Sequence, residues 1–291
     1  MTELNLSPVV TGLWRLGEWR LGVEGLVRWI ERALELGVTS FDHADIYGGY
    51  GVEGLFGDAL AAAPGLRERL QIVTKCGIKL VSPARPTHAI KHYDSSRAHV
   101  LASVDQSLRA LRTDRIDLLL VHRPDPLADP DELAETFTTL RAQGKVLHFG
   151  VSNHAPSQLA TLHRRIPLAT NQIEFSPLHL APLSDGTLDQ CTDLGLRPML
   201  WSPLAGGRLF TSDDESAKRV RRVLGEIAHA HGVSPATVAY AWLMRHPSRP
   251  RPITGSSRID AVAEAVAAQQ VTLDRQQWTR IWTASTGHDV A

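Results

Sequence analysis

Apolar runs of strand length alternate with segments of helical periodicity along almost the whole chain. In the helical segments apolar residues recur every three or four positions, as in the stretch that holds Leu26, Trp29, Ile30, Ala33 and Leu34. This alternation is typical of a parallel sheet built from βα units. The strands are expected over eight ranges: 11–15, 39–42, 71–75, 116–122, 146–151, 168–172, 197–201 and 252–254. Eight parallel strands with helices between them close most readily into a (β/α)8 TIM barrel, an α/β fold.

Turn residues separate the expected elements. Gly37 stands at the C-cap of the first helix, Pro64-Gly65 stops the second, and Asp129-Pro130 opens a later one. The segment 77–96 carries prolines and histidines without a clear period and exceeds an ordinary βα connection, so we expect a functional loop over the site. No linker, low-complexity tract or repeat divides the chain, which predicts one barrel domain over 1–291.

Composition points to small-molecule partners. The chain has 291 residues, of which 43% are hydrophobic and 21% charged, and its formal net charge is zero. No basic run indicates a nucleic-acid partner, and no apolar run approaches the roughly 18 residues that span a membrane. The first residues do not resemble a signal peptide, and Cys76 and Cys191 are too few for a disulfide framework. We therefore expect a cytoplasmic protein with reduced thiols.

Titratable side chains gather where three neighbouring strands are expected to end. Asp42 ends the second strand and Tyr47 follows it, while Lys75 ends the third strand and His122 the fourth. In a TIM barrel the C-terminal strand ends meet at one mouth, where active sites lie. A phenol carries its proton at neutral pH, and a lysine held by an aspartate stabilises the developing phenolate. These residues therefore predict a general acid, Tyr47, beside an imidazole that orients a carbonyl oxygen.

The stretch from Phe41 to Gly48 resembles the signature of the aldo-keto reductases, with His43 where the family normally has Thr or Ser. Further family motifs follow in the family's order along the chain. They are Thr74-Lys75, Val121-His122-Arg123, Gly144-Lys145-Val146 to Ser152-Asn153, Asn171-Gln172, Trp201-Ser202-Pro203-Leu204 and Ile253-Thr254-Gly255-Ser256. Within the family the chain is most similar to short bacterial oxidoreductases that carry Asp-His-Ala-Asp-Ile-Tyr-Gly and His-Arg-Pro-Asp-Pro.

The resemblance implies hydride transfer from NAD(P)H to an aldehyde or ketone. It implies that Tyr47 is the acid, that Asp42 and Lys75 tune it, and that His122 positions the carbonyl. It also implies an aromatic face for the nicotinamide at Trp201. The remaining residues expected at the cofactor are Ser152, Asn153 and Gln172 for the amide, Ser202, Leu204, Gly206 and Arg208 near the pyrophosphate, and Gly255, Ser256, Ser257 and Arg258 after the last strand.

The loop after the last strand predicts a preference for NADPH. Its serine hydroxyls, free backbone amides and the Arg258 guanidinium suit the extra 2′-phosphate of that cofactor. Here the chain also departs from the family. Relatives carry Arg and then Glu-Asn in the following helix, whereas this chain has Ala261, Glu264 and Ala265. Arg258 therefore has to substitute for the usual contacts.

Two other functions fit parts of the sequence. His43, Asp45 and His122 suggest a metal-dependent barrel hydrolase, although that function leaves Lys75 and Tyr47 without a role. A non-catalytic sensor or scaffold that binds nicotinamide cofactor is also compatible, since each site residue taken alone fits a structural role. The oligomeric state is open.

The substrate is open as well. It depends on the 77–96 loop, on Trp14 and Trp19, and on side chains after His122 that no motif fixes.

Overall fold

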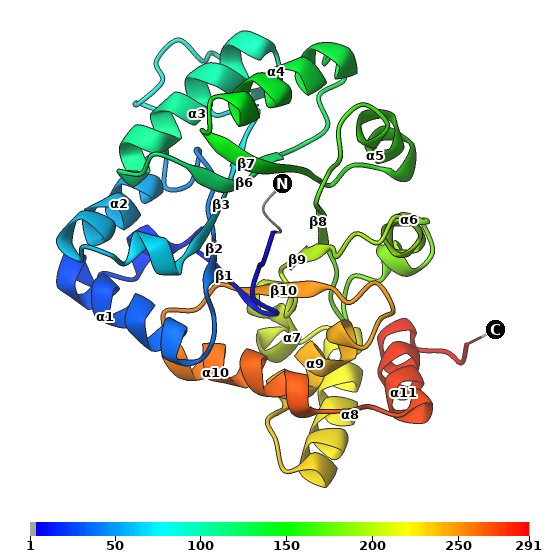
Figure 1. The fold of residues 1–291 in the computed structure, drawn as a ribbon. Coiled ribbons are helices and arrows are strands. Elements are labelled where there is room, and N and C mark those ends of the chain that lie inside the picture. The colour runs from blue at the N-terminus through cyan, green and yellow to red at the C-terminus, as the bar shows by residue number, and fades with distance from the viewer. Residues whose placement is uncertain (1–3, 291) are drawn as a thin grey trace.

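The computed structural model describes residues 4–290 and contains a closed barrel of eight parallel strands. Figure 1 shows the helices around the outside of these strands. In order around the barrel the strands are β1 (Val10–Gly12), β2 (Ser40–Asp42), β3 (Gln71–Cys76), β6 (Ile116–Val121), β7 (Val146–Ser152), β8 (Asn171–Glu174), β9 (Met199–Trp201) and β10 (Arg251–Thr254). The barrel closes where β1 pairs with β10. The expected TIM barrel is confirmed.

Helices follow the strands and cover the barrel (Figure 1). They are α1 (Gly22–Glu35), α2 (Val52–Ala62), α3 (Arg97–Leu111), α4 (Pro130–Ala142), α5 (Pro156–His163), α6 (Thr187–Asp193), α7 (Arg208–Thr211), α8 (Glu215–His231), α9 (Pro235–Met244), α10 (Ile259–Ala267) and α11 (Arg275–Thr286). Short 3-10 turns are η1 (Leu16–Glu18), η2 (Arg67–Arg69), η3 (Ala181–Leu183), η4 (Ala205–Gly207) and η5 (Ala268–Gln270). The expected start of α4 is confirmed, because Asp129 caps it and Pro130 is its first residue.

Two expected strands differ from the structure by three residues at one end. The first ends at Gly12, because the chain turns at once and Leu16 N donates to Leu13 O. The strand expected over 168–172 is β8, which runs from Asn171 to Glu174. Asn171 and Gln172 therefore open this strand, and the strand continues past them toward the barrel mouth.

Alternate strand residues fill the inside of the barrel. The interior cluster combines Leu6 with Val10, Val73, Leu118, Leu120, Met199 and Ile253, all of them buried. Leu6 comes from the segment before β1, and this segment is fixed at the start of β2 because Ser7 N donates to Ser40 Oγ at 2.8 Å. The intervening strand residues, such as Phe41, Ile72 and Phe149, pack outward with the helices. Strand periodicity of two thus separates an inner core from an outer one.

The 77–96 segment is more ordered than the sequence suggests. It contains an antiparallel pair of short strands, β4 (Ile78–Lys79) and β5 (His92–Tyr93). Both ends of the segment are attached to the barrel mouth. Leu80 N donates to the Tyr50 hydroxyl at 2.8 Å, and Ser95 N donates to Asp125 Oδ2 at 2.8 Å. The segment therefore has a fixed position beside the strand exits.

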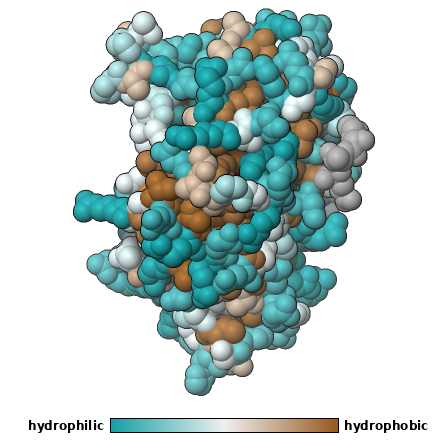
Figure 2. All heavy atoms as spheres, turned by 60° about the vertical axis from the view of Figure 1, so that its left-hand side comes forward, coloured by the Kyte–Doolittle hydropathy of each residue, from teal (hydrophilic) through white to brown (hydrophobic). Residues whose placement is uncertain are grey.

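Figure 2 views the side of the molecule on which α1 and α2 lie in Figure 1. Apolar residues gather there in one area that polar side chains surround. Val23 on α1 and Leu55 on α2 are exposed apolar residues of these helices.

No helix within residues 4–290 combines the length and apolar character needed to cross a bilayer.

The close approach of α2 to α3 generates a stability prediction. A Cβ atom at Gly57 would lie 2.0 Å from the Ala110 carbonyl oxygen on α3. Gly57→Ala should therefore force the helices apart and lower the free energy of unfolding by about 1–3 kcal/mol or more, measured by urea denaturation.

The matched control is Gly54→Ala in the same helix, where a new Cβ atom meets nothing within 4 Å. That change should raise the free energy of unfolding by about 0.5–1 kcal/mol through helix propensity. Equal effects of the two changes would show that the α2–α3 contact does not require glycine.

Candidate active site

The ammonium group of Lys75 lies at the centre of the residues expected to be catalytic. Its Nζ atom is 2.7 Å from Asp42 Oδ2, 2.7 Å from the His43 carbonyl oxygen and 3.1 Å from the Tyr47 hydroxyl. Burial alone lowers the pKa of Lys75, but Asp42 and Tyr47 raise it, and the net direction is upward. Lys75 therefore stays charged and donates to three oxygens.

Strand alternation aims these side chains into the barrel. Lys75 follows the inward-facing Val73 by two positions, and His122 follows the inward-facing Leu120 by two. Asp42 is the last residue of β2, whose preceding residue packs outward. The three side chains consequently reach the C-terminal end of the barrel from neighbouring strands, as TIM-barrel active sites require.

Tyr47 comes from the loop between β2 and α2 and is half-buried. Burial raises the pKa of its phenol, and the charge of Lys75 only partly offsets this effect. The hydroxyl therefore keeps its proton at neutral pH. Its ring lies edge-on to the imidazole of His122, with 6.1 Å between the ring centroids. Phenol and imidazole thus face the same small region of the mouth.

His122 is buried and neutral. Burial lowers its pKa well below the usual value, and the nearby cations Lys75, Arg123 and Lys91 lower it further. Its Nδ1 atom is buried without a hydrogen-bond partner among the described residues. A neutral imidazole can donate one hydrogen bond to a substrate oxygen without a competing charge.

A hydrogen-bonded chain continues from Asp42 across the mouth. Gln172 Nε2 donates to Asp42 Oδ1 at 2.8 Å, and Ser152 Oγ donates to the Gln172 carbonyl at 2.9 Å. Asn153 Nδ2 donates to Ser152 Oγ at 2.8 Å and its Oδ1 accepts from Trp201 Nε1 at 3.0 Å. The four residues expected around the nicotinamide are therefore brought together and joined to the catalytic carboxylate.

The loops after β9 and β10 contain the other residues expected at the cofactor. Ser202, Gly206 and Gly207 have positive φ, and a Cβ atom at either glycine would meet nothing within 4 Å. Leu204 N-caps the 3-10 turn η4, which leads to Arg208, an exposed residue that pairs with Asp214 at 3.3 Å. This backbone is open to the approach of an anion.

The loop after β10 leads directly into α10. Arg258 is exposed at the N-cap position of α10, and its N–H donates to Ser256 Oγ at 3.2 Å. The Ser257 carbonyl accepts from Trp29 Nε1 at 2.8 Å, and Gly255 is exposed. The guanidinium of Arg258 therefore extends from a loop that α1 holds in place.

The residues named for a metal-dependent hydrolase do not share one site. His43 is fully buried against the Phe56 ring, with 4.6 Å between centroids, and burial lowers its pKa to about 3. Asp45 accepts from Ser103 on α3 at 2.8 Å. Within residues 4–290 no group of three or more His, Cys, Asp or Glu is placed to hold a metal ion. His43 is thus a packing residue.

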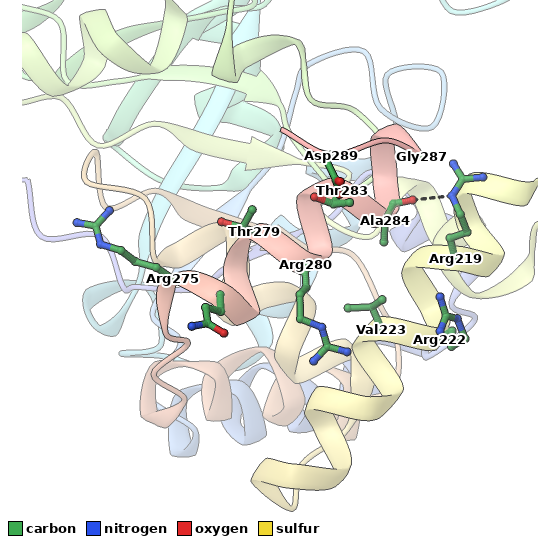
Figure 3. Close-up of a pocket in the computed structure, with 11 residues that line it drawn as sticks. Arg219, Arg222, Val223, Arg275, Thr279, Arg280, Thr283, Ala284, Gly287 and Asp289 are labelled. Atoms are coloured by element: carbon green, nitrogen blue, oxygen red, sulfur yellow. Dashed lines mark hydrogen bonds between the residues drawn. The ribbon is translucent and has the colours of Figure 1, made fainter. Parts of the chain in front are cut away.

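A cavity of about 630 Å³ lies between α8 and α11, and none of the residues expected to be catalytic or cofactor-binding lines it (Figure 3). Arginines dominate its walls, but several are engaged within the protein. Arg219 donates to the Ala284 carbonyl at 3.0 Å, and Arg222 and Arg280 both pair with Glu226. This cavity is a seam between two helices and lies apart from the barrel mouth.

The fold and this mouth agree with the comparisons with known proteins. A family model described as the aldo/keto reductase family matches residues 8–285. The chain belongs to the aldo/keto reductase family. The resemblance carried by the sequence motifs is thereby confirmed.

Bacterial oxidoreductases are similar to this aldo/keto reductase over its whole length. The uncharacterized oxidoreductase YcsN of Bacillus subtilis (strain 168) is 49% identical, over 99% of this chain and 97% of the relative. The oxidoreductase YdhF of Escherichia coli (strain K12) is 51% identical, over 98% and 96%. A 6-dehydroglucose reductase of Agrobacterium fabrum is 41% identical, over 99% and 97%. These relatives place the chain among the oxidoreductases.

A solved structure has the same architecture. The thermostable aldo-keto reductase Tm1743, crystallised with the inhibitor epalrestat, superposes with a TM-score of 0.81 at 26% sequence identity. The match covers 97% of this chain and 98% of that chain.

The sequence assigned no specific role to some residues that lie at the mouth of this aldo/keto reductase. Arg123 follows His122 and donates to its carbonyl oxygen at 2.8 Å. Asp125 fixes the end of the 77–96 segment through Ser95 N. The signal available in the sequence is their position, because polar residues that directly follow a buried strand face the mouth. Trp14 is 61% exposed after β1, whereas Trp19 is half-buried and packs on Trp29 with 4.9 Å between ring centroids.

Two further acids, Glu53 and Asp45, are buried behind Lys75, on the outer side of β3. Glu53 accepts from Thr74 Oγ1 at 2.6 Å, and Asp45 accepts from Ser103. Burial raises the pKa of Asp45 from its ordinary 3.8 to about 7, and the neighbouring charge of Glu53 adds to this rise. Asp45 Oδ1 has no partner among the described residues. Asp45 is therefore protonated in the folded protein below about pH 7.

This raised pKa predicts a pH-dependent stability. Below about pH 4 Asp45 carries its proton in both states, and between about pH 4 and 7 only the folded state keeps it. The free energy of unfolding should therefore fall as pH rises through this window. Between pH 4 and pH 8 the free energy of unfolding of wild type should fall by about 3–4 kcal/mol more than that of Asp45→Asn, measured by urea denaturation.

The control is Asp114→Asn, which changes a carboxylate whose side chain is 86% exposed. Its pH profile should run parallel to that of wild type. If Asp45→Asn also runs parallel to wild type, Asp45 is ionised in the folded protein.

Proposed function

We propose that this aldo/keto reductase uses NADPH to reduce an aldehyde or ketone to an alcohol, with Tyr47 as the general acid. The observation that carries the proposal is the contact of Lys75 Nζ with both Asp42 Oδ2 and the Tyr47 hydroxyl, at 2.7 and 3.1 Å. A protonated phenol against a buried, anchored cation is suited to give up its proton when a negative oxygen forms nearby.

Each of these side chains has a separate role in the reduction of the carbonyl group. When bound, NADPH supplies the hydride for the carbonyl carbon. His122 donates a hydrogen bond to the carbonyl oxygen and holds it near the phenol. Tyr47 transfers its hydroxyl proton to that oxygen, Lys75 stabilises the resulting phenolate, and the phenolate regains a proton from water.

The residues at the strand exits fit a nicotinamide cofactor. The Ser152 hydroxyl and the side-chain amides of Asn153 and Gln172 offer donors and acceptors that can exchange their present hydrogen bonds for bonds to a carboxamide. Trp201 is half-buried and presents a ring beside them, which suits stacking. The positive-φ backbone of 202–207 and the Arg258 loop supply amides and a cation for phosphates.

Small carbonyl compounds are the proposed substrates and the cytoplasm the proposed location. Both Cys76 and Cys191 are free and buried, which suits a reducing compartment.

Removal of the phenolic hydroxyl tests the proposed function. Tyr47→Phe should lower the rate of carbonyl reduction at least 100-fold, because general acid catalysis raises a reaction rate by roughly 10²- to 10⁴-fold. Binding of NADPH, measured by fluorescence titration, should change little. Steady-state NADPH oxidation with a panel of aldehydes and ketones gives the rate.

Tyr50→Phe is the matched control, because it removes a nearby phenol that binds Leu80 N and does not contact Lys75. It should retain most of the wild-type rate. A Tyr47→Phe enzyme with more than about a tenth of that rate would show that another group supplies the proton.

The cofactor choice is tested at Arg258. A charge-assisted hydrogen bond contributes about 1.5–3 kcal/mol, so wild type should bind NADPH roughly ten- to a hundredfold more tightly than NADH. Arg258→Ala should remove most of this preference, because the guanidinium is the cation at the start of α10.

Arg275→Ala, an exposed arginine in the first turn of α11, should leave the preference intact. Equal dissociation constants for the two cofactors in wild type would show that the loop does not read the 2′-phosphate.

A further inference from the structure

The guanidinium of Arg123 lies at the barrel mouth beside the proposed catalytic groups. It is half-buried, donates to the His122 carbonyl at 2.8 Å and reaches Ser152 Oγ at 3.4 Å. Its Cζ atom also lies 5.8 Å from the centroid of the Trp201 ring. Burial lowers its pKa, and Tyr93 and Tyr47 lie close enough to oppose this shift. Arg123 therefore adjoins the carbonyl-reduction site.

This cation has no carboxylate partner. Arg123 belongs to none of the ion pairs formed within residues 4–290, whereas the other buried cation at the mouth, Lys75, is paired with Asp42. Glu174 at the end of β8 is the carboxylate that acts on the charge of Arg123, without an ion-pair contact. A guanidinium has five N–H donors, and the two hydrogen bonds of Arg123, to the His122 carbonyl and to Ser152 Oγ, both use the same terminal nitrogen. Within residues 4–290 the second terminal nitrogen of Arg123 makes no hydrogen bond, which leaves its donors for a ligand.

A second cation reinforces the positive field on this side of the mouth. Lys91, in the 77–96 segment, is exposed and lies near enough to His122 to lower its pKa. Besides Arg123, a second cation therefore lies close to His122.

We propose that Arg123 binds a carboxylate carried by the substrate, so that the preferred substrates are aldehyde or keto acids. The inference rests on the proposed reduction of carbonyl groups and names its substrate class. A half-buried guanidinium that lacks a counter-ion recovers its desolvation cost when a carboxylate binds, and its planar fork matches two carboxylate oxygens. Lys91 strengthens the same preference from the 77–96 segment.

The cofactor phosphates are a poor match for this guanidinium. The amides and cations suited to them lie after β9 and β10, at 202–208 and 255–258. Arg123 instead follows β6 and bonds to the carbonyl oxygen of His122, the residue that would orient the substrate. Arg123 is thus placed beside the residues proposed for the nicotinamide, where the reacting carbonyl would lie, and on a different loop from those suited to the phosphates.

The test compares acids with their neutral esters. The pairs are 4-carboxybenzaldehyde with methyl 4-formylbenzoate, and succinic semialdehyde with methyl 4-oxobutanoate. Wild type should have the higher kcat/KM for each acid. Arg123→Met should lower the acid-to-ester ratio roughly ten- to a hundredfold, mainly through KM of the acid, and Arg123→Lys should restore part of it.

Two further variants separate charge from structure. Glu174→Gln removes the opposing carboxylate and should raise the acid-to-ester ratio, which a purely structural role of Arg123 does not predict. Arg141→Met removes another half-buried arginine, on α4, whose Cζ atom lies 5.2 Å from the centroid of the Phe149 ring, and it should leave the ratio unchanged.

A binding measurement keeps the two proposals distinguishable. Calorimetric titration with 4-(hydroxymethyl)benzoate and its methyl ester reports carboxylate binding without turnover. Loss of the acid preference in Arg123→Met supports the inference in either assay. The same acid-to-ester ratio in wild type and Arg123→Met overturns it, even when both substrates are reduced. If no carbonyl compound oxidises NADPH or NADH, the proposed function fails, and the calorimetric ratio alone decides the role of Arg123.

Discussion

The buried charge of Lys75 is the constraint on which the rest of the site depends. A buried ammonium is costly unless oxygen atoms surround it, and here Asp42 Oδ2, the His43 carbonyl and the Tyr47 hydroxyl do so within 3.1 Å. Two of these oxygens belong to the loop after β2. The loop must therefore fold so that Tyr47 faces the lysine, and the contact that stabilises the charge also places the proposed acid.

The same requirement extends across the barrel. Asp42 accepts from Lys75 with one oxygen and from Gln172 with the other, and Gln172 comes from β8, on the opposite side of the barrel from β2. Gln172 is joined in turn to Ser152, and the chain ends at Trp201. Groups suited to the cofactor and groups suited to proton transfer are thus parts of one network, whose members hold one another in position.

Charge is distributed unevenly around this network. Lys75 is neutralised by a carboxylate at 2.7 Å, whereas Arg123 is held by a backbone carbonyl and an aromatic face. Behind the lysine, Asp45 is buried with a raised pKa and stays protonated below about pH 7. Within residues 4–290 the ammonium at the centre of the site thus has a carboxylate counter-ion, and the half-buried guanidinium of Arg123 has none.

The sequence by itself determined the barrel and the strand exits, because periodicity and turn residues are local. The two-residue period puts Lys75 and His122 on the inner face with Val73 and Leu120, and their position at strand ends brings them to one mouth. The family motifs pointed in the same way to the residues proposed for the cofactor. Short elements were less visible: α6 has seven residues, and the β4–β5 pair has two per strand.

Only the tertiary structure decided which groups meet. Gln172 is 130 residues from Asp42 in sequence, and Asp45 is 58 residues from Ser103, so no local pattern relates them. Barrel closure brings such residues together, and burial then sets their pKa values. The lack of a carboxylate beside Arg123 likewise follows from packing, since the chain is electrically neutral overall and its sequence does not say which charges pair.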